Sequence, residues 1–438
     1  MIRRLLLYTL TIVVILTACS DNESFSSSAG NRLTFSQDTI SFDTLFSAVP
    51  SATRTFWVYN DSGDGIRIRT ARLERSGQSG YRVNVDGTYL DPVGTDFEIR
   101  KGDSILVFVE VTTHENHIDG PQLVEDNLLL TLESGVEQRV NLRTYSWDAQ
   151  KVSDLVISRD TLIESSVPII FYGKGIEVAE HATLTLRNST FYFHDGAGIS
   201  VKGQLVADSC IFRGDRLDRM FDYLPYDRIP AQWEGVRFDY PSLDNELNNC
   251  EIRNAVNSVV CDSSFVSLSN TIIHNSGGYG LAARNSVVTL LYCQLTNSYG
   301  DCLLLSGGDA LVDHCTLAQF FSFSANRGVA LRFTNTKLPL SLLCTNTLVT
   351  GYDDDVVMGP DKKDTIVAEY RFVDCLMRTP AVSDSTRFER VIWETPKDSV
   401  QGKMHFRTID EDKLYYDFTI DSISPAFLHD IGRIVRVP

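Results

Sequence analysis

The sequence predicts an all-β protein in which an antiparallel β-sandwich precedes a parallel β-helix, a solenoid of stacked coils. Two observations lead to this prediction. Short runs of alternating apolar and polar residues fill the first third of the chain, and a motif then recurs at intervals close to 22 residues. Alternation with a period of two is typical of strands with one buried face, whereas a fixed longer period is typical of repeat proteins.

The N-terminus predicts export. Arg3 and Arg4 precede an apolar run over residues 5–16, which is shorter than the roughly 20 residues that a spanning helix needs. This is the layout of a secretory signal peptide, predicted here over residues 1–18. The run ends in LTAC at residues 16–19, which resembles the lipobox of bacterial lipoproteins. The resemblance implies that Cys19 is acylated, for example with palmitate, whereas a generic secreted protein with a chance cysteine is the alternative.

Several acyl chains on one residue would hold the chain firmly to a membrane. Ser20 stands where an aspartate would resemble an inner-membrane retention signal, and Asp21 and Glu23 resemble a surface-export signal. We therefore expect an outer-membrane protein, lipid-anchored and exposed at the cell surface. The serine-rich residues 19–32 would form the lipidated tether.

Residues 33–148 contain short alternating runs separated by turn signals such as Asp86-Gly87 and Ser134-Gly135. This pattern predicts an antiparallel β-sandwich. The order of its strands and turns resembles the immunoglobulin-like domains of envelope proteins, and that resemblance implies no chemistry.

Residues 149–377 are predicted to form the β-helix. A small residue followed two places later by an apolar one recurs at steps of 20, 40, 21, 22, 22, 32 and 28 residues. Steps of 21 or 22 correspond to one coil, and the longer steps to a coil plus an insertion. The members of the series are Thr190, Cys210, Cys250, Thr271, Cys293, Cys315, Thr347 and Cys375.

The series predicts an inward column of small side chains, because alternate residues of a strand point to opposite faces. Buried cysteines at strand spacing pack as small hydrophobes, although a Cys293–Cys315 disulfide is an alternative. Asn254, Asn275 and Asn297 follow four residues later, and asparagine tolerates left-handed turns. They resemble the asparagine ladders of pectate-lyase-like proteins and are expected to bond from coil to coil.

Residues 378–438 lose the regular step, and their closing segment resembles the last coil and cap of bacterial β-helix proteins. Taken as a whole, the chain resembles outer-membrane lipoproteins with an immunoglobulin-like domain and a right-handed parallel β-helix. That family implies fold and location without an assigned reaction.

The formal net charge of −17 argues against nucleic acid as a partner. We expect no cofactor and assign no catalytic residue, and a non-catalytic binding or assembly scaffold is the preferred function. The alternative is a polysaccharide lyase or glycoside hydrolase with a divergent site, because many β-helices cleave acidic polysaccharides. The repeats lack the Gly-His-Gly and Arg-x-Lys motifs of the galacturonan hydrolases that this fold resembles.

Two acidic stretches contain candidate residues for a calcium site or a catalytic site. Asp353, Asp354 and Asp355 are weak calcium candidates, because calcium prefers carboxylate oxygens, but a solvated acidic turn is the preferred interpretation. A second stretch would need its residues on one outward face to act as an acid–base pair, and a structural role is again preferred. It contains Asp301, Asp309, Asp313 and His314.

The first insertion, residues 214–230, is rich in Arg, Asp and Tyr, unlike an ordinary solvent loop. Tyr and Arg are enriched where binding energy concentrates at interfaces. The insertion is therefore the candidate contact site for outer-membrane proteins or glycans, with folding back onto the solenoid as the alternative. The candidate residues are Asp215, Arg216, Arg219, Phe221, Tyr223, Tyr226 and Arg228.

Overall fold

The computed structural model describes residues 24–361, 366–395 and 402–434, and the chain divides into two compact units at Trp147/Asp148. Cys19 and the predicted signal peptide lie outside the described residues. Among the described residues, no helix is both long and apolar enough to cross a bilayer.

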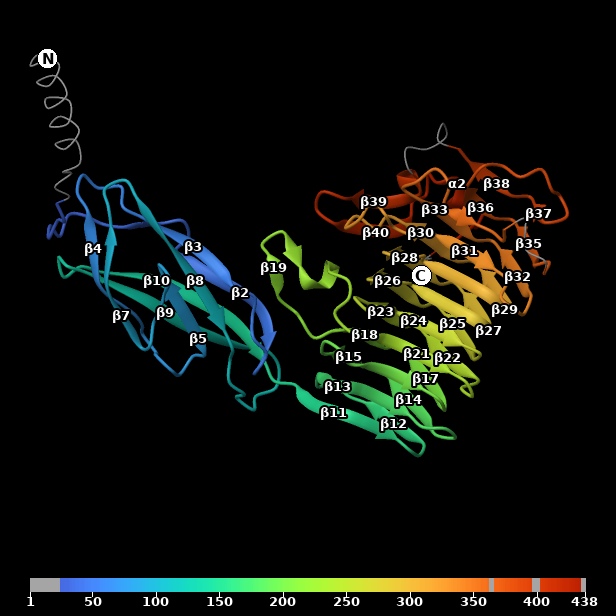
Figure 1. Cartoon of the computed structure of the whole chain (residues 1–438), viewed down its shortest axis with the longest axis horizontal. Coiled ribbons are helices and arrows are strands. Elements are labelled where there is room, and N and C mark those ends of the chain that lie inside the picture. Colours follow the sequence, from blue (N-terminus) through green and yellow to red (C-terminus); the bar gives the residue numbers. More distant parts are fainter. Residues whose placement is uncertain (1–23, 362–365, 396–401, 435–438) are drawn as a thin grey trace, which may run out of the picture. The chain divides into compact units, whose positions relative to one another are not determined.

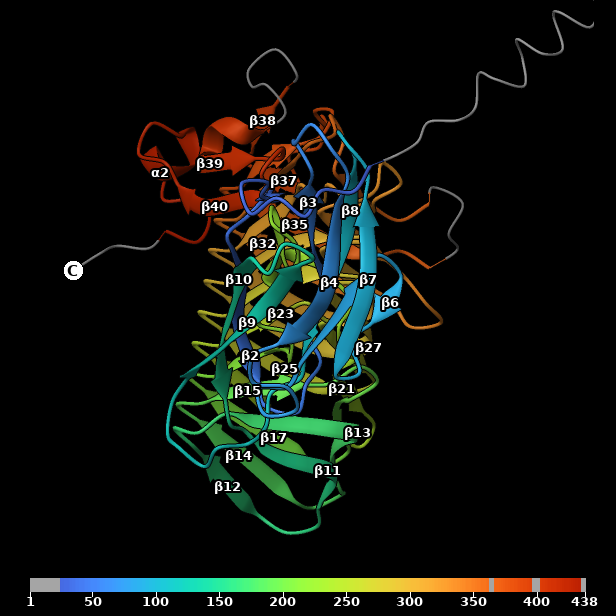
Figure 2. The same ribbon diagram turned by 90° about the vertical axis from the view of Figure 1, so that its left-hand side faces the viewer.

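The first unit is a β-sandwich of two five-stranded sheets, whose strands run roughly along its length (Figure 2). One sheet has the order β1 (Thr34–Phe35), β3 (Arg54–Tyr59), β8 (Ser104–Val111), β5 (Tyr81–Val85) and β6 (Thr88–Tyr89). The other has the order β2 (Thr39–Phe46), β10 (Glu137–Trp147), β9 (Gln122–Leu132), β4 (Ile66–Leu73) and β7 (Val93–Ile99). Alternate residues such as Phe56, Val58, Val107 and Val109 point inward and are buried, as the sequence alternation predicts.

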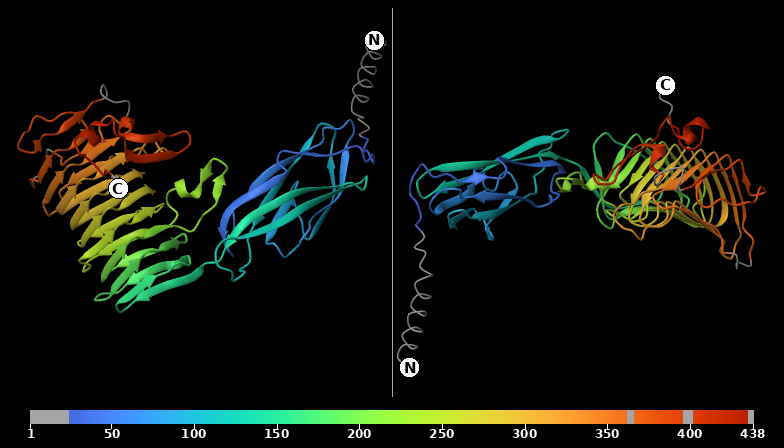
Figure 3. Two further views of the ribbon diagram at one scale, coloured as in Figure 1. Left: turned by 180° about the vertical axis from the view of Figure 1, so that it is seen from behind. Right: turned by 90° about the horizontal axis from the view of Figure 1, so that it is seen from above.

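The second unit is a parallel β-helix whose 26 strands run from β11 (Gln150–Ile157) to β38 (Ile392–Glu394) (Figures 1 and 3). Each coil contributes one strand to each of three faces, here named A, B and C. The parallel strands therefore continue to residue 394, beyond the regular step that ends at 377 in the sequence. Irregular steps in the last coils hide these strands from a search for a fixed period.

Face A contains β16 (Gly198–Val201), β21 (Gly235–Asp239), β24 (Val259–Asp262), β31 (Leu331–Thr334), β34 (Val357–Met358) and parts of β11, β13 (Ile169–Val178), β27 (Leu281–Leu291) and β29 (Leu303–Asp313). Face B contains β12 (Thr161–Glu164), β14 (Thr183–Arg187), β17 (Gln204–Asp208), β22 (Asn245–Asn248), β25 (Phe265–Ser269), the ends of β27 and β29, β32 (Leu340–Thr345), β35 (Glu369–Val373) and β37 (Phe388–Glu389).

Face C begins with the first parts of β11 and β13. It continues through β15 (Thr190–Phe193), β18 (Ile211–Gly214), β23 (Glu251–Arg253), β26 (Ile272–Ser276), β28 (Gln294–Ser298), β30 (Thr316–Gln319), β33 (Leu348–Gly351), β36 (Leu376–Arg378) and β38.

The cysteine column lies inside the solenoid. The eight described cysteines are buried free thiols, so the structure contains no Cys293–Cys315 disulfide. One member of the predicted column is wrong, because Thr190 pairs with Ile211 and the residue level with Cys210 is therefore Ser189. Ser189 is buried and Thr190 is not, and the two adjacent small residues made the sequence pattern ambiguous.

Between β14 and β36, two residues separate each face B strand from the following face C strand, and the first of the two adopts the left-handed conformation, with φ between 46° and 56°. Asparagine fills several of these positions because it accepts positive φ at low cost. The column consists of Asn188, Ser209, Asn249, Asn270, Tyr292, His314, Asn346 and Asp374. Asn254, Asn275 and Asn297 form a second left-handed column after face C, with φ of 64°, 55° and 52°.

The closing segment is not a further coil. After η2 (Lys403–His405), β39 (Phe406–Asp410) and β40 (Tyr415–Ile420) pair antiparallel and are followed by α2 (Pro425–Leu428). Phe406, Phe418 and Ile420 of this hairpin pack in one apolar cluster with Leu348 and Leu376 of face C. The hairpin thus covers the outer side of the last face C strands (Figure 1).

Candidate functional site

The insertion leaves the solenoid after Gly214 at the end of β18. Its centre is a small hairpin of β19 (Arg219–Phe221) and β20 (Leu224–Pro225), followed by η1 (Tyr226–Arg228). The chain rejoins the coil at Trp233, which is fully buried and bridges to Ala255.

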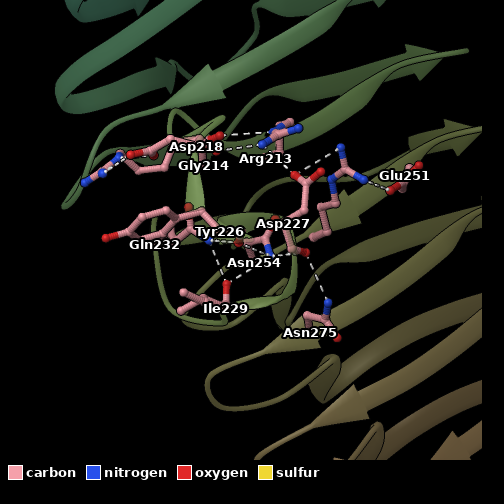
Figure 4. Close-up of polar contacts among 12 residues, drawn as sticks. Arg213, Gly214, Asp218, Tyr226, Asp227, Ile229, Gln232, Glu251, Asn254 and Asn275 are labelled. Atoms are coloured by element: carbon pink, nitrogen blue, oxygen red, sulfur yellow. Dashed lines mark hydrogen bonds and ion pairs between the residues drawn. The ribbon is translucent and has the colours of Figure 1, made fainter. Parts of the chain in front are cut away.

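Ion pairs with a buried or half-buried guanidinium fix the base of the insertion to face C (Figure 4). Arg213 of β18 is only 8% exposed and lies 2.6 Å from the carboxylate of Asp227. Arg253 of β23 approaches the same carboxylate at 3.6 Å and pairs with Glu251 at 2.9 Å. Burial lowers the pKa of Arg213, and the charge of Asp227 opposes that effect. A buried guanidinium needs such a partner, because an unpaired buried charge is costly.

Two of the three asparagines in the second column hold the insertion. Asn254 donates from its Nδ2 to the carbonyls of Asp227 and Ile229, both at 2.9 Å (Figure 4). Asn275 donates to the carbonyl of Asp227 at 3.3 Å, whereas Asn297 accepts from the backbone of Phe320 at 3.2 Å. Asn254 and Asn275 therefore bond to the insertion and not from coil to coil as predicted, whereas Asn297 does bond to the backbone of the next coil.

Three of the candidate contact residues belong to this base. Asp215 is buried and lies 2.7 Å from His194, while burial raises its pKa. Arg216 binds Asp218 with two hydrogen bonds of 2.8 and 2.7 Å and lies 4.1 Å from the centroid of the Tyr226 ring. These side chains are engaged within the protein and explain how the insertion keeps its shape.

The tip of the insertion is different, because its large side chains face solvent. Phe221 is 52% exposed and Tyr223 is 67% exposed. Their rings are stacked, with centroids 5.7 Å apart and planes 10° apart. Met220 beside them is also exposed, and Arg219 donates to the carbonyl of Asp222 at 3.0 Å. The tip therefore presents a flat aromatic surface on a fixed support.

A groove of about 460 Å³ lies on the outer side of face C, between the insertion and the β39–β40 hairpin. We call it the face C groove. Arg228 of the insertion donates to the carbonyl of Lys413 and lies 5.9 Å from the ring centroid of Tyr415, so the two segments meet there. The lining residues used below are Asp227, Glu251, His274, Asn275, Gln294, Asn297, Asp417 and Arg433.

Cationic side chains engage two carboxylates of the groove, those of Glu251 and Asp227. Burial alone would raise the pKa of Glu251, but His274 at 3.1 Å and two arginines outweigh it and lower the pKa to about 2. The general acid of a glycosidase has a raised pKa, and the pKa of Glu251 is shifted in the opposite direction. Asp227 is held between Arg213 and Arg253.

A second hollow, of about 410 Å³, lies on the outer side of face A. Val260, Ala282 and Leu304 contribute to its lining, and Arg237 and Arg284 line it as well. Asp262 is the one carboxylate among its lining residues in the described chain, so this hollow lacks a pair of carboxylates.

The two acidic stretches lie apart from both hollows. Asp353 pairs with Arg327 at 3.2 Å, Asp354 with Arg378 at 2.7 Å, and Asp355 accepts from Thr379 at 2.7 Å. Because each carboxylate turns to a different partner, the three do not converge as calcium ligands. No cluster of three or more His, Cys, Asp or Glu within the described residues is arranged to hold a metal.

The residues of the other acidic stretch make contacts between neighbouring coils. Asp301 is buried and binds Arg332 of the next coil through two hydrogen bonds of 2.6 and 3.0 Å. Asp313 accepts from Thr345 at 2.6 Å and Asn346 at 3.0 Å, both on the following coil. Asp309 lies opposite Val287 and Ser341 in face B. His314 stacks on Tyr292 at 4.9 Å.

One buried chain of hydrogen bonds was not foreseen from the sequence. His405 lies 2.8 Å from Ser424 Oγ and 3.1 Å from Glu394, whose other oxygen pairs with Arg378 at 2.8 Å. The order Ser–His–Glu is that of a hydrolase triad, but all of these side chains are buried and Ser424 also accepts from the backbone of Ala426. The arrangement fastens the closing segment to face C, since no substrate could reach the hydroxyl.

Residues 153–317 match the family model described as a right handed beta helix region, and the described fold of that stretch agrees with it. The β-helix is thus of the right-handed kind. No curated protein matched the chain.

Solved structures show only distant likeness. An α-1,3-glucanase of family GH87 from Streptomyces thermodiastaticus is 11% identical over 78% of this chain and 91% of its own, with a TM-score of 0.23. A family 123 glycoside hydrolase from Clostridium perfringens is 7% identical over 27% of this chain and 26% of its own, with a TM-score of 0.20. A PapD-like domain of human CEP192 is 11% identical over 30% of this chain and 94% of its own, with a TM-score of 0.19. Likeness at this level carries no argument about function.

Proposed function

We propose that the protein is a lipid-anchored, non-catalytic binding scaffold of the bacterial outer membrane, which presents the tip of the insertion to a partner at the cell surface. The observation that carries the proposal is the stacked, exposed pair of Phe221 and Tyr223 above a base that ion pairs hold to face C. Large exposed aromatic side chains cost solubility, and they are enriched in interface hot spots.

The fixed base lowers the free-energy cost of binding. Ordering a flexible loop costs free energy on association, and a loop that is already ordered avoids part of that cost. Arg213, Asp227 and Asn254 order the insertion before any partner arrives. A rigid scaffold that presents a binding loop is a common arrangement in proteins.

The anchor rests on the lipobox-like residues 16–19 that end in Cys19. In this proposal the tether and an immunoglobulin-like sandwich separate the solenoid from the membrane. The partner is an outer-membrane protein or a glycan, because either can use aromatic faces and guanidinium groups.

The test compares three proteins in affinity purification from detergent-solubilised outer membranes. These are the wild type, the double variant Phe221→Ser/Tyr223→Ser, and the control Tyr89→Ser, which removes a tyrosine that is 62% exposed on the sandwich. Co-eluting proteins and glycans are identified for each.

We expect the double variant to fold with an unchanged thermal midpoint and to lose at least one specific partner that the control retains. If the folded double variant keeps every partner of the wild type, the tip is not the contact site.

A further inference from the structure

The face C groove contains a positive charge that the described protein does not neutralise. Arg433 follows α2, is half-buried, and lines the groove. No described carboxylate lies within ion-pairing distance of its guanidinium, and its side chain has no described hydrogen-bond partner. Burial lowers the pKa of Arg433. A half-buried guanidinium without a partner is an unfavourable state that an anion would relieve.

The three carboxylates of the groove have other partners, so the charge of Arg433 remains available to a ligand. Glu251 is paired with Arg253 and His274, and Asp227 with Arg213. Asp417 accepts the backbone N–H of Thr419 at 3.0 Å. Arg228, whose guanidinium faces the ring of Tyr415, adds a second positive charge to the wall.

Neutral hydrogen-bonding groups accompany the two arginines. The amide of Gln294 has no described partner, and the amide of Asn297 accepts one hydrogen bond through its Oδ1, which leaves its N–H donors free within the described chain. The volume of about 460 Å³ lies in the range of small-molecule sites, roughly 300–1,000 Å³.

We propose that the face C groove binds a small polar ligand through an anionic group, a carboxylate, phosphate or sulfate, held by Arg433 and oriented by Gln294 and Asn297. The site is separate from the aromatic tip and does not depend on the partner proposed for it. It takes residues from the insertion, from face C and from the closing segment, so it exists only in the folded solenoid (Figure 1).

The experiment measures binding by isothermal titration calorimetry with five probes: inorganic phosphate, inorganic sulfate, D-glucuronate, D-glucose 6-phosphate and D-glucose. The variants are Arg433→Gln, Gln294→Ala and, as a matched control, Arg284→Gln, which removes an exposed arginine on face A. Circular dichroism and thermal midpoints check the folding of each protein. The variant Phe221→Ser/Tyr223→Ser is titrated in parallel.

We expect D-glucuronate or D-glucose 6-phosphate to bind the wild type, Arg284→Gln and the tip variant alike. Arg433→Gln should weaken that binding at least ten-fold, and Gln294→Ala should weaken it for the sugar anions more than for the inorganic ions. The proposal is overturned if no anionic probe binds, if Arg433→Gln binds as tightly as the wild type, or if D-glucose binds as well as D-glucose 6-phosphate. Equal binding of inorganic phosphate and D-glucose 6-phosphate would overturn the orienting role of the amides. The tip variant should lose membrane partners and still bind the anion. The binding of a partner at the tip and the binding of an anion in the face C groove are thus tested separately.

Discussion

The ion pair between Arg213 and Asp227 should control whether the insertion stays docked on face C. Asp227→Ala removes the carboxylate that lies 2.6 Å from a guanidinium only 8% exposed. Breaking a fully buried pair costs about 3–5 kcal/mol, because the remaining charge is left unpaired. The carboxylate of Asp227 is itself 47% exposed, so water replaces part of the lost interaction. We therefore expect local opening of the insertion to become easier by about 2 kcal/mol, or roughly 30-fold in population.

Limited proteolysis with chymotrypsin measures this opening. Phe221 and Tyr223 are the target side chains at the tip, and cleavage there requires the short β19–β20 hairpin to open. When reclosing is fast relative to cleavage, the rate follows the open population, so it should rise roughly 30-fold in Asp227→Ala. The hydrogen bonds from Asn254 to backbone carbonyls remain in the variant, which should keep the solenoid folded.

The matched control is Asp239→Ala. Asp239 pairs with Arg237 at 2.8 Å on face A, where the guanidinium of the pair is 53% exposed rather than 8%. Removing the carboxylate of Asp239 should leave the rate of chymotrypsin cleavage at the tip unchanged. A cleavage rate of Asp227→Ala within two-fold of the wild type would refute the idea that this ion pair holds the insertion.

Four further predictions follow from the same structure and sequence. Cys19→Ala should release the protein from membranes, and a variant that still sediments with outer membranes after a high-salt wash would disprove the anchor. Glu251 has a pKa lowered from 4.5 to about 2, so its stabilising contribution, roughly 3 kcal/mol, is present above pH 4.5 and is lost as the pH falls towards 2. Urea unfolding of Glu251→Gln should vary less with pH over that range, and parallel curves would contradict the assignment. The thiols of Cys293, Cys302 and Cys315 are buried, so they should react slowly with alkylating reagents in the folded protein, and rapid native labelling would argue against the register. Burial also raises the pKa of Cys302 to about 12, which slows its reaction further. Cys315→Ser should destabilise by about 1–3 kcal/mol in urea unfolding, through a buried and poorly satisfied hydroxyl.

The β-helix could be predicted because its stabilising contacts repeat along the chain. Each coil places a small inward residue above the previous one, so Cys250, Thr271, Cys293 and Cys315 occur at steps of 21 or 22 residues. The same logic failed where the pattern was ambiguous, since Ser189 and Thr190 both satisfy the rule and only the pairing of Thr190 with Ile211 selects between them. After residue 377 the steps are irregular, so the sequence indicated a last coil and a cap there but not the strands that end at Glu394.

The insertion and the face C groove depend on contacts that do not repeat along the chain. The composition of residues 214–230 indicated that the segment was unusual. It did not indicate which of its side chains would be buried. Asp215 and Arg216 proved to be internal, whereas Phe221 and Tyr223 face solvent, because Arg253 and Asn254 of another coil fix the base. Arg433 meets Gln294 in one groove across 139 positions of sequence. The sequence by itself determined the repeating scaffold, since that depends on a local period, and the tertiary structure decided the sites, since they depend on single contacts between distant segments that no period encodes.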